Sequence, residues 1–110
     1  MKKYSTQAEA VIDMNDRGYT SDFKLVGNDL FWVQGKFFIR AGDFWVTEYY
    51  QFRDPSVRTR GLVVFGVIAF HHNLRGILIN HYSKHTHLAA PVLLKKVNEM
   101  NHARDLQFNC

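Results

Sequence analysis

The chain has 110 residues, 46% of them hydrophobic and 22% charged, with 2 prolines, 7 glycines and a formal net charge of +4. This length and apolar content predict a single domain over residues 1–110 with one hydrophobic core, and they argue against a disordered chain. The longest apolar run, residues 62–70, is about half as long as a membrane-spanning helix, so we expect no membrane insertion. The fourteen Lys and Arg residues are spread along the chain, and this distribution alone does not indicate a nucleic-acid partner.

Cys110, the only cysteine, is the last residue, so we expect neither an intramolecular disulfide nor a thiolate metal cluster. The first six residues lack the apolar run of a signal peptide. A cytoplasmic protein without a cofactor is therefore expected.

Thr6 and Glu9 have the spacing of a capping box, in which the hydroxyl accepts from the glutamate amide and the carboxylate bonds back to the cap amide. This pattern predicts a helix that begins after Thr6. Gly18 is expected to end the helix, because glycine readily adopts a left-handed conformation.

From Asp22 onward the apolar period becomes two, which indicates a sheet. The expected strands cover residues 23–26, 30–33, 36–40, 43–53, 62–70 and 77–82. The fifth of these is apolar on both faces, as in a central strand. Pro91 suits the first turn of a closing helix. We therefore predict an α+β fold with two layers: an antiparallel meander of four to six strands, with the N-terminal and C-terminal helices packed on one face.

Six histidines raise the question of a metal site. A hairpin turn centred on residues 74–75 would place His72 opposite Ile77 and His81 opposite Ile68. The two histidines would then lie on one face but about 13 Å apart, too far to share an ion. No metal is predicted.

Glu48 alternates with Phe44, Val46, Tyr50 and Phe52, so it is expected on the apolar side of its strand. A carboxylate there requires a Lys, an Arg, a tyrosine hydroxyl or a ligand as a partner, because an unpaired buried charge shifts to its neutral form. Glu48 is therefore a candidate buried acid, with a structural role favoured over a catalytic one.

The loop between the fourth and fifth strands is the best candidate for an anion site. Arg53, Arg58 and Arg60 supply guanidinium groups there, next to two hydroxyl side chains. Such groups hold phosphate through charge-assisted hydrogen bonds. An ordinary solvated loop has the same composition, so any binding is expected to be weak.

Several segments together resemble a group of short bacterial proteins of unknown function that are often labelled phosphoribosylpyrophosphate synthetase or transferase. The segments are residues 19–23, Asp43-Phe44, Glu48, Tyr50, Phe52 and residues 75–80. The resemblance implies a helix followed by an antiparallel sheet. Phosphoribosyl chemistry uses two adjacent acids and a loop of backbone amides for the phosphate. No two acidic residues are adjacent here, so we expect the label without the activity. Residues 54–60, usually acidic in the group, are basic in this chain.

These observations favour a non-catalytic domain that binds a small anionic ligand or another protein. One alternative is an enzyme that acts on a small phosphorylated substrate, with Glu48 as acid or base. Another is a surface for single-stranded nucleic acid, on which Trp45 and Tyr49 would stack bases beside Arg53.

A homodimer is also expected. Two helices on one face would leave the other, apolar face exposed to solvent, and a second copy of the chain could cover it. That dimer face would contain Trp45, Tyr49, Ile68, Phe70 and Ile79. The alternative cover is the segment 23–40, which would fold back over the same face and leave a monomer.

Overall fold

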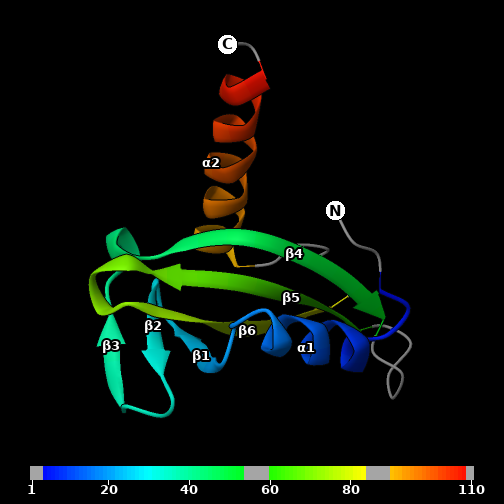
Figure 1. The fold of residues 1–110 in the computed structure, drawn as a ribbon, viewed down its shortest axis with the longest axis horizontal. Helices are drawn as coiled ribbons and strands as arrows, with labels where there is room; N and C mark the ends of the chain where they lie inside the picture. The colour runs from blue at the N-terminus through cyan, green and yellow to red at the C-terminus, as the bar shows by residue number, and fades with distance from the viewer. Residues whose placement is uncertain (1–3, 54–59, 84–89, 109–110) are drawn as a thin grey trace.

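The computed structural model describes residues 4–53, 60–83 and 90–108, which form two α-helices, six strands and two short 3-10 turns (Figure 1). The elements in chain order are α1 (Gln7–Asp16), β1 (Ser21–Val26), β2 (Asp29–Trp32), β3 (Phe37–Ile39), η1 (Ala41–Asp43), β4 (Trp45–Arg53), β5 (Arg60–Ala69), η2 (Phe70–His72), β6 (Leu74–Ser83) and α2 (Pro91–Phe108). The predicted α+β class is confirmed. Neither helix, in the part of the chain that is described, is long and apolar enough to cross a membrane.

All six strands belong to one sheet with the order β3-β2-β1-β6-β5-β4. β1, β2 and β3 pair antiparallel with their neighbours, as do β4, β5 and β6. The two groups are joined by β1 and β6, which run parallel, with Ser21 opposite Gly76. The prediction of a single antiparallel meander is therefore wrong at this junction. After β3 the chain passes through η1 to the opposite edge of the sheet instead of adding the next strand alongside.

The capping box starts α1 as expected, with one difference. The Thr6 hydroxyl accepts from the backbone amide of Glu9 at 3.2 Å. The Glu9 carboxylate accepts from the amide of Ser5 at 3.1 Å, one residue before the cap amide that the motif usually bonds. Gly18 follows the helix with a φ of +101°, the left-handed conformation predicted for it.

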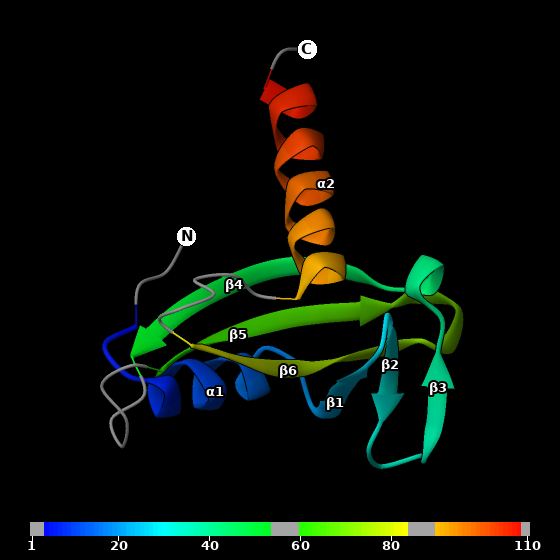
Figure 2. The same cartoon turned by 180° about the vertical axis from the view of Figure 1, so that it is seen from behind.

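The two helices cover opposite faces of the sheet, which corrects the prediction that both pack on one face. Met14 of α1 packs in a cluster with Val64 of β5. Leu93 of α2 packs in a second cluster, which contains the neighbouring Val63. Successive side chains of a strand point to opposite faces, so the clusters lie on either side of β5. Figures 1 and 2 show α1 lying along one side of the sheet and α2 rising from the other.

The helices lie on opposite faces because of β5, which was correctly predicted as a central strand. It pairs with β4 on one side and β6 on the other, and residues 61–67 are all buried. A strand that is apolar on both faces requires a cover on both, and one helix supplies each cover.

The hairpin between β5 and β6 turns earlier than predicted. η2 takes up three residues, and Asn73 then adopts a left-handed φ of +53°. Ile68 consequently pairs with Arg75, and His81 pairs with Leu62, so the predicted pairings of His72 and His81 are wrong. Among the described residues, no group of three or more His, Cys, Asp or Glu side chains is close enough to hold a metal ion.

An irregularity at Thr47 changes which side chains of β4 share a face. Val46 pairs with Val67 and Glu48 pairs with Gly66, so Thr47 is an extra residue in the strand. Such a bulge breaks the alternation of side chains. Val46 and Glu48 therefore lie on opposite faces, and the predicted single face from residue 44 to 52 is wrong.

The bulge also divides the predicted dimer face. Trp45 pairs with Ile68, and the bulge puts it out of alternation with Tyr49, which pairs with Phe65 on the face that α2 covers. β4 is an edge strand, and the Trp45 ring lies 5.7 Å from Nζ of Lys96 in α2. Ile79 packs against the α1 cluster. Residues 23–40 do not fold over the sheet, because they form strands of it. The homodimer stays a prediction. Of the residues predicted for its face, Trp45 and Phe70 are the aromatic side chains that are exposed.

Candidate functional site

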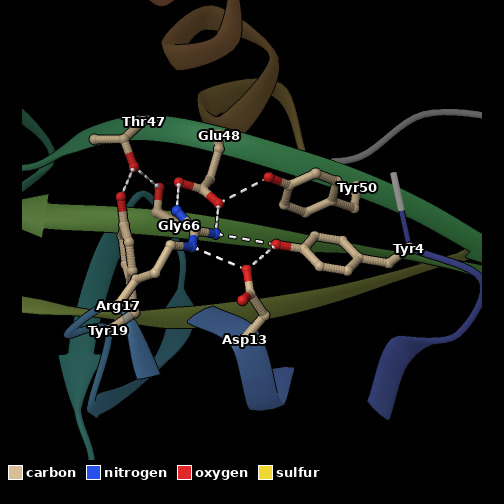
Figure 3. Close-up of polar contacts among 8 residues, drawn as sticks. All are labelled: Tyr4, Asp13, Arg17, Tyr19, Thr47, Glu48, Tyr50 and Gly66. Atoms are coloured by element: carbon tan, nitrogen blue, oxygen red, sulfur yellow. Dashed lines mark hydrogen bonds and ion pairs between the residues drawn. The ribbon is translucent and has the colours of Figure 1, made fainter. Parts of the chain in front are cut away.

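The most concentrated polar cluster in the described chain surrounds Glu48, between α1 and the sheet (Figure 3). Glu48 is only 9% exposed. It follows the bulge of β4, which turns its side chain toward α1 instead of toward α2. Gly66 lies opposite it on β5, and a Cβ atom there would be 2.8 Å from Cγ of Glu48. The missing side chain at residue 66 therefore makes room for the carboxylate.

Arg17, the residue that caps the C-terminus of α1, binds both oxygens of this carboxylate. Its Nη1 donates to Oε2 of Glu48 at 2.9 Å, and its Nη2 donates to Oε1. The hydroxyl of Tyr50, two residues along β4, also donates to Oε1 at 2.8 Å. The carboxylate thus accepts three hydrogen bonds, two of them in the paired geometry that makes arginine a strong partner.

The same guanidinium connects Glu48 to the N-terminal segment. Nε of Arg17 donates to Oδ2 of Asp13 at 3.0 Å, and Nη2 contacts the hydroxyl of Tyr4 at 3.3 Å. Tyr4 donates in turn to Asp13, and its ring meets that of Tyr50 edge-on at 4.7 Å. Two carboxylates therefore share one arginine, and residue 4, α1 and β4 are held together.

A second branch of the cluster runs through the bulge. The hydroxyls of Tyr19 and Thr47 are 2.7 Å apart, and Thr47 donates to the carbonyl oxygen of Gly66 at 3.3 Å. Two guanidinium groups lie near the ring of Tyr19, that of Arg17 at 5.5 Å and that of Arg75 at 5.2 Å from the ring centroid. The Thr47 hydroxyl at the bulge therefore has two partners: the Tyr19 hydroxyl, between α1 and β1, and the backbone of β5.

These contacts fix the protonation states of the cluster. Burial acts to raise the pKa of Glu48, but the hydrogen bonds from Arg17 and Tyr50 outweigh it and hold the pKa below its ordinary value. Burial and the bond to Glu48 raise the pKa of Tyr50. Burial also raises the pKa of Tyr19. At neutral pH Glu48 is therefore a carboxylate, and the hydroxyls of Tyr50 and Tyr19 are neutral.

The sequence correctly indicated that Glu48 would need an arginine or tyrosine partner, but it did not identify Arg17. A signal was present, because Arg17 follows Ala10 and Met14 at intervals of four and three residues. These two residues are the buried positions of α1, so the spacing places Arg17 on the same face.

The predicted anion site is not assembled in the described residues. Arg58 lies outside them, and Arg53 and Arg60 are both exposed. Arg53 pairs with Gly61, the residue after Arg60, so the two arginine side chains point to opposite faces of the sheet. The predicted surface for single-stranded nucleic acid is divided in the same way, because the bulge separates Trp45 from Tyr49 and Arg53.

Arg53 instead borders an open pocket of about 670 Å³ between the start of α1 and the end of β4. The lining consists of Tyr4, Ser5, Thr6, Gln7, Ala8, Gln51, Phe52 and Arg53. It contains one cation, several uncharged hydrogen-bonding side chains and no carboxylate.

Comparisons with protein-family models, curated proteins and solved structures found no match to this chain.

Proposed function

We propose that the chain is a non-catalytic binding domain, in which the Glu48 cluster holds α1 on the sheet and other molecules bind at the surface. The observation that supports this most directly is the pairing of Glu48, whose two oxygens both accept from Arg17. A general acid must carry a proton near neutral pH, and a general base must have a free oxygen that faces a substrate. Glu48 is deprotonated and its oxygens are occupied, which favours the structural role over the enzyme alternative.

The pocket beside Arg53 favours a small anion as the ligand. Arg53 provides the charge, and the hydroxyl and carboxamide side chains of Ser5 and Gln51 can donate further hydrogen bonds. The pocket also lies at the N-terminal end of α1, where the helix dipole favours negative charge. Because the site is open, binding should weaken as salt screens the charges.

Ribose 5-phosphate tests both the binding of an anion in the pocket and the absence of catalysis. We expect it to raise the melting temperature of the wild-type chain, because a ligand that binds only the folded state stabilises it. Arg53→Ala should abolish this shift. Arg60→Ala is the matched control and should retain it, since Arg60 is exposed but does not line the pocket.

The enzyme alternative is tested in the same samples after ATP is added. We expect phosphorus NMR to show no conversion of ribose 5-phosphate. Conversion that disappears in a folded Glu48→Gln variant would contradict the non-catalytic role. An unchanged melting temperature at every concentration of ribose 5-phosphate would contradict anion binding in this pocket. The proposed binding partner would then be another protein.

A further inference from the structure

On the side of the sheet where α1 lies, the part formed by β1, β2 and β3 has no helix packed on it in the described chain. α1 packs against β5 and β6, where Met14 shares a cluster with Val64 and Ile77. Figures 1 and 2 show β2 and β3 beyond the end of α1. On this side of the three strands, Val26 is 51% exposed and Phe38 is 59% exposed. The face therefore leaves apolar side chains in contact with solvent.

An aromatic pair lies at the centre of this face. Phe31 of β2 is directly opposite Phe38 of β3, and their ring centroids are 5.2 Å apart. Their neighbours Leu30 and Ile39 are buried on the other side of the sheet, with α2. The amide of Val33 donates to a carbonyl oxygen of β1 at 2.9 Å, so the pairing of β2 continues and Val33 shares the side of Phe31. The centre of the face is therefore aromatic and aliphatic.

Charged side chains of both signs lie around this centre. Taken across the strands, the face consists of three rows: Asp22 with Val33, Lys24 with Phe31 and Phe38, and Val26 with Asp29 and Arg40. Asp22 accepts a hydrogen bond from Gln34 at 2.8 Å, and Asp29 accepts one from the amide of Ala41 at 3.1 Å. The two cations and two carboxylates of these rows balance, so the face does not favour a polyanion such as a nucleic acid. It favours a surface with the same balance of charges.

We propose that this face binds the same face of a second copy of the chain, in a weak two-fold dimer. The two-fold axis lies in the plane of the contact and runs diagonally across the strands through Phe31. Phe31 then meets Phe31 of the second copy, and Val33 meets Phe38 of the second copy. The strands of the two copies cross steeply, as in the orthogonal class of sheet packing.

The same rotation matches the charges. It brings Asp22 to Arg40 of the second copy and Lys24 to Asp29 of the second copy, and the symmetry repeats each pair. Every cation of the three rows therefore meets a carboxylate, and the ion pairs surround the apolar centre. This agreement between the charges and a single rotation is the reason for choosing a second copy as the partner.

The size of the face makes the dimer a weak one. Three strands with up to three side chains each span roughly 14 Å by 20 Å. A standard interface buries about 800 Å² on each partner, which is more than this face can supply. We therefore expect a dissociation constant above about 10 µM, so that dilute protein is monomeric.

Sedimentation of the full chain from about 5 µM to about 500 µM tests the dimer. We expect the mass to rise with concentration from 12.9 kDa toward twice that value. Phe38→Asp should stay monomeric, because the dimer would bury its carboxylate among apolar side chains. Phe38 is exposed in the monomer, so this variant should fold. Phe70→Asp is the matched control, since Phe70 is 62% exposed but lies in η2, and it should still associate. A wild-type mass independent of concentration, or association lost in Phe70→Asp but kept in Phe38→Asp, would overturn the proposal.

A mixture of two variants tests the arrangement of the charges. Arg40→Glu alone and Asp22→Lys alone each place like charges opposite one another, so each should associate about tenfold more weakly than wild type. In an equal mixture, Asp22 of the first variant meets Arg40 of the second, and the two substituted side chains meet with opposite charges. The mixture should therefore associate about as tightly as wild type. A mixture that associates no more tightly than the separate variants would contradict the proposed contact.

Discussion

Replacing Gly76 with alanine is expected to lower the free energy of unfolding by about 3 kcal/mol, at the upper end of the usual cost of overpacking. Gly76 lies on β6 opposite Ser21, where the two halves of the sheet meet in parallel. A Cβ atom at residue 76 would lie 2.2 Å from the carbonyl oxygen of Ser21 and 2.7 Å from the ring of Phe23. The oxygen belongs to the backbone, so β1 must move away from β6 to admit the methyl group.

Gly42 supplies the control for this substitution. It lies in η1, and a Cβ atom there would meet no atom within 4 Å. Urea unfolding of the two alanine variants isolates the effect of the junction from the general effect of replacing glycine. Equal midpoints for Gly76→Ala and Gly42→Ala would show that β1 and β6 are not packed as closely as described.

Arg17→Met is expected to cost about 3 kcal/mol, the low end of the range for breaking a buried ion pair, because the arginine side chain is partly exposed. Methionine keeps an unbranched apolar stem but removes both donors to Glu48 and the Nε donor to Asp13. The carboxylate would then remain buried with Tyr50 as its donor. Burial would raise its pKa, and the remaining stability would decline as the pH rises and Glu48 ionises.

Two further variants make this result specific to the pair. Arg40→Met removes an exposed arginine outside the cluster and should change the free energy of unfolding by less than about 0.5 kcal/mol. Glu48→Gln combined with Arg17→Met should cost less than the sum of the two single substitutions, since neither partner is left as an unpaired charge. Additive costs would mean that the two residues do not interact.

Local signals in the sequence were sufficient for part of this fold. The capping box located the start of α1, and the apolar run of residues 62–70 identified β5 as a central strand. Each of these depends on residues that are close together in the chain. The need of Glu48 for a partner was also predictable, because desolvation of a carboxylate depends only on its burial.

The features that the sequence did not predict depend on contacts between distant residues. The parallel pairing of β1 with β6 joins residues 21–23 to residues 76–78, and no turn signal marks it. The bulge at Thr47 adds one residue without a glycine or proline to indicate it, and one residue is enough to reverse the faces of a strand. The predicted faces for Trp45, Tyr49 and Glu48 therefore failed together.

The carboxyl carbon of Glu48, followed by NMR as the pH is lowered, gives the most direct test of its structural role. We predict an inflection below the ordinary value of 4.5, because the bonds from Arg17 and Tyr50 outweigh burial. Stability from this group would be fully present above pH 4.5 and lost as the pH falls through the inflection. Tyr50→Phe should move the inflection upward by removing one donor. An inflection near neutral pH in the wild-type chain would contradict the account, since a carboxyl that carries a proton there is available as a general acid.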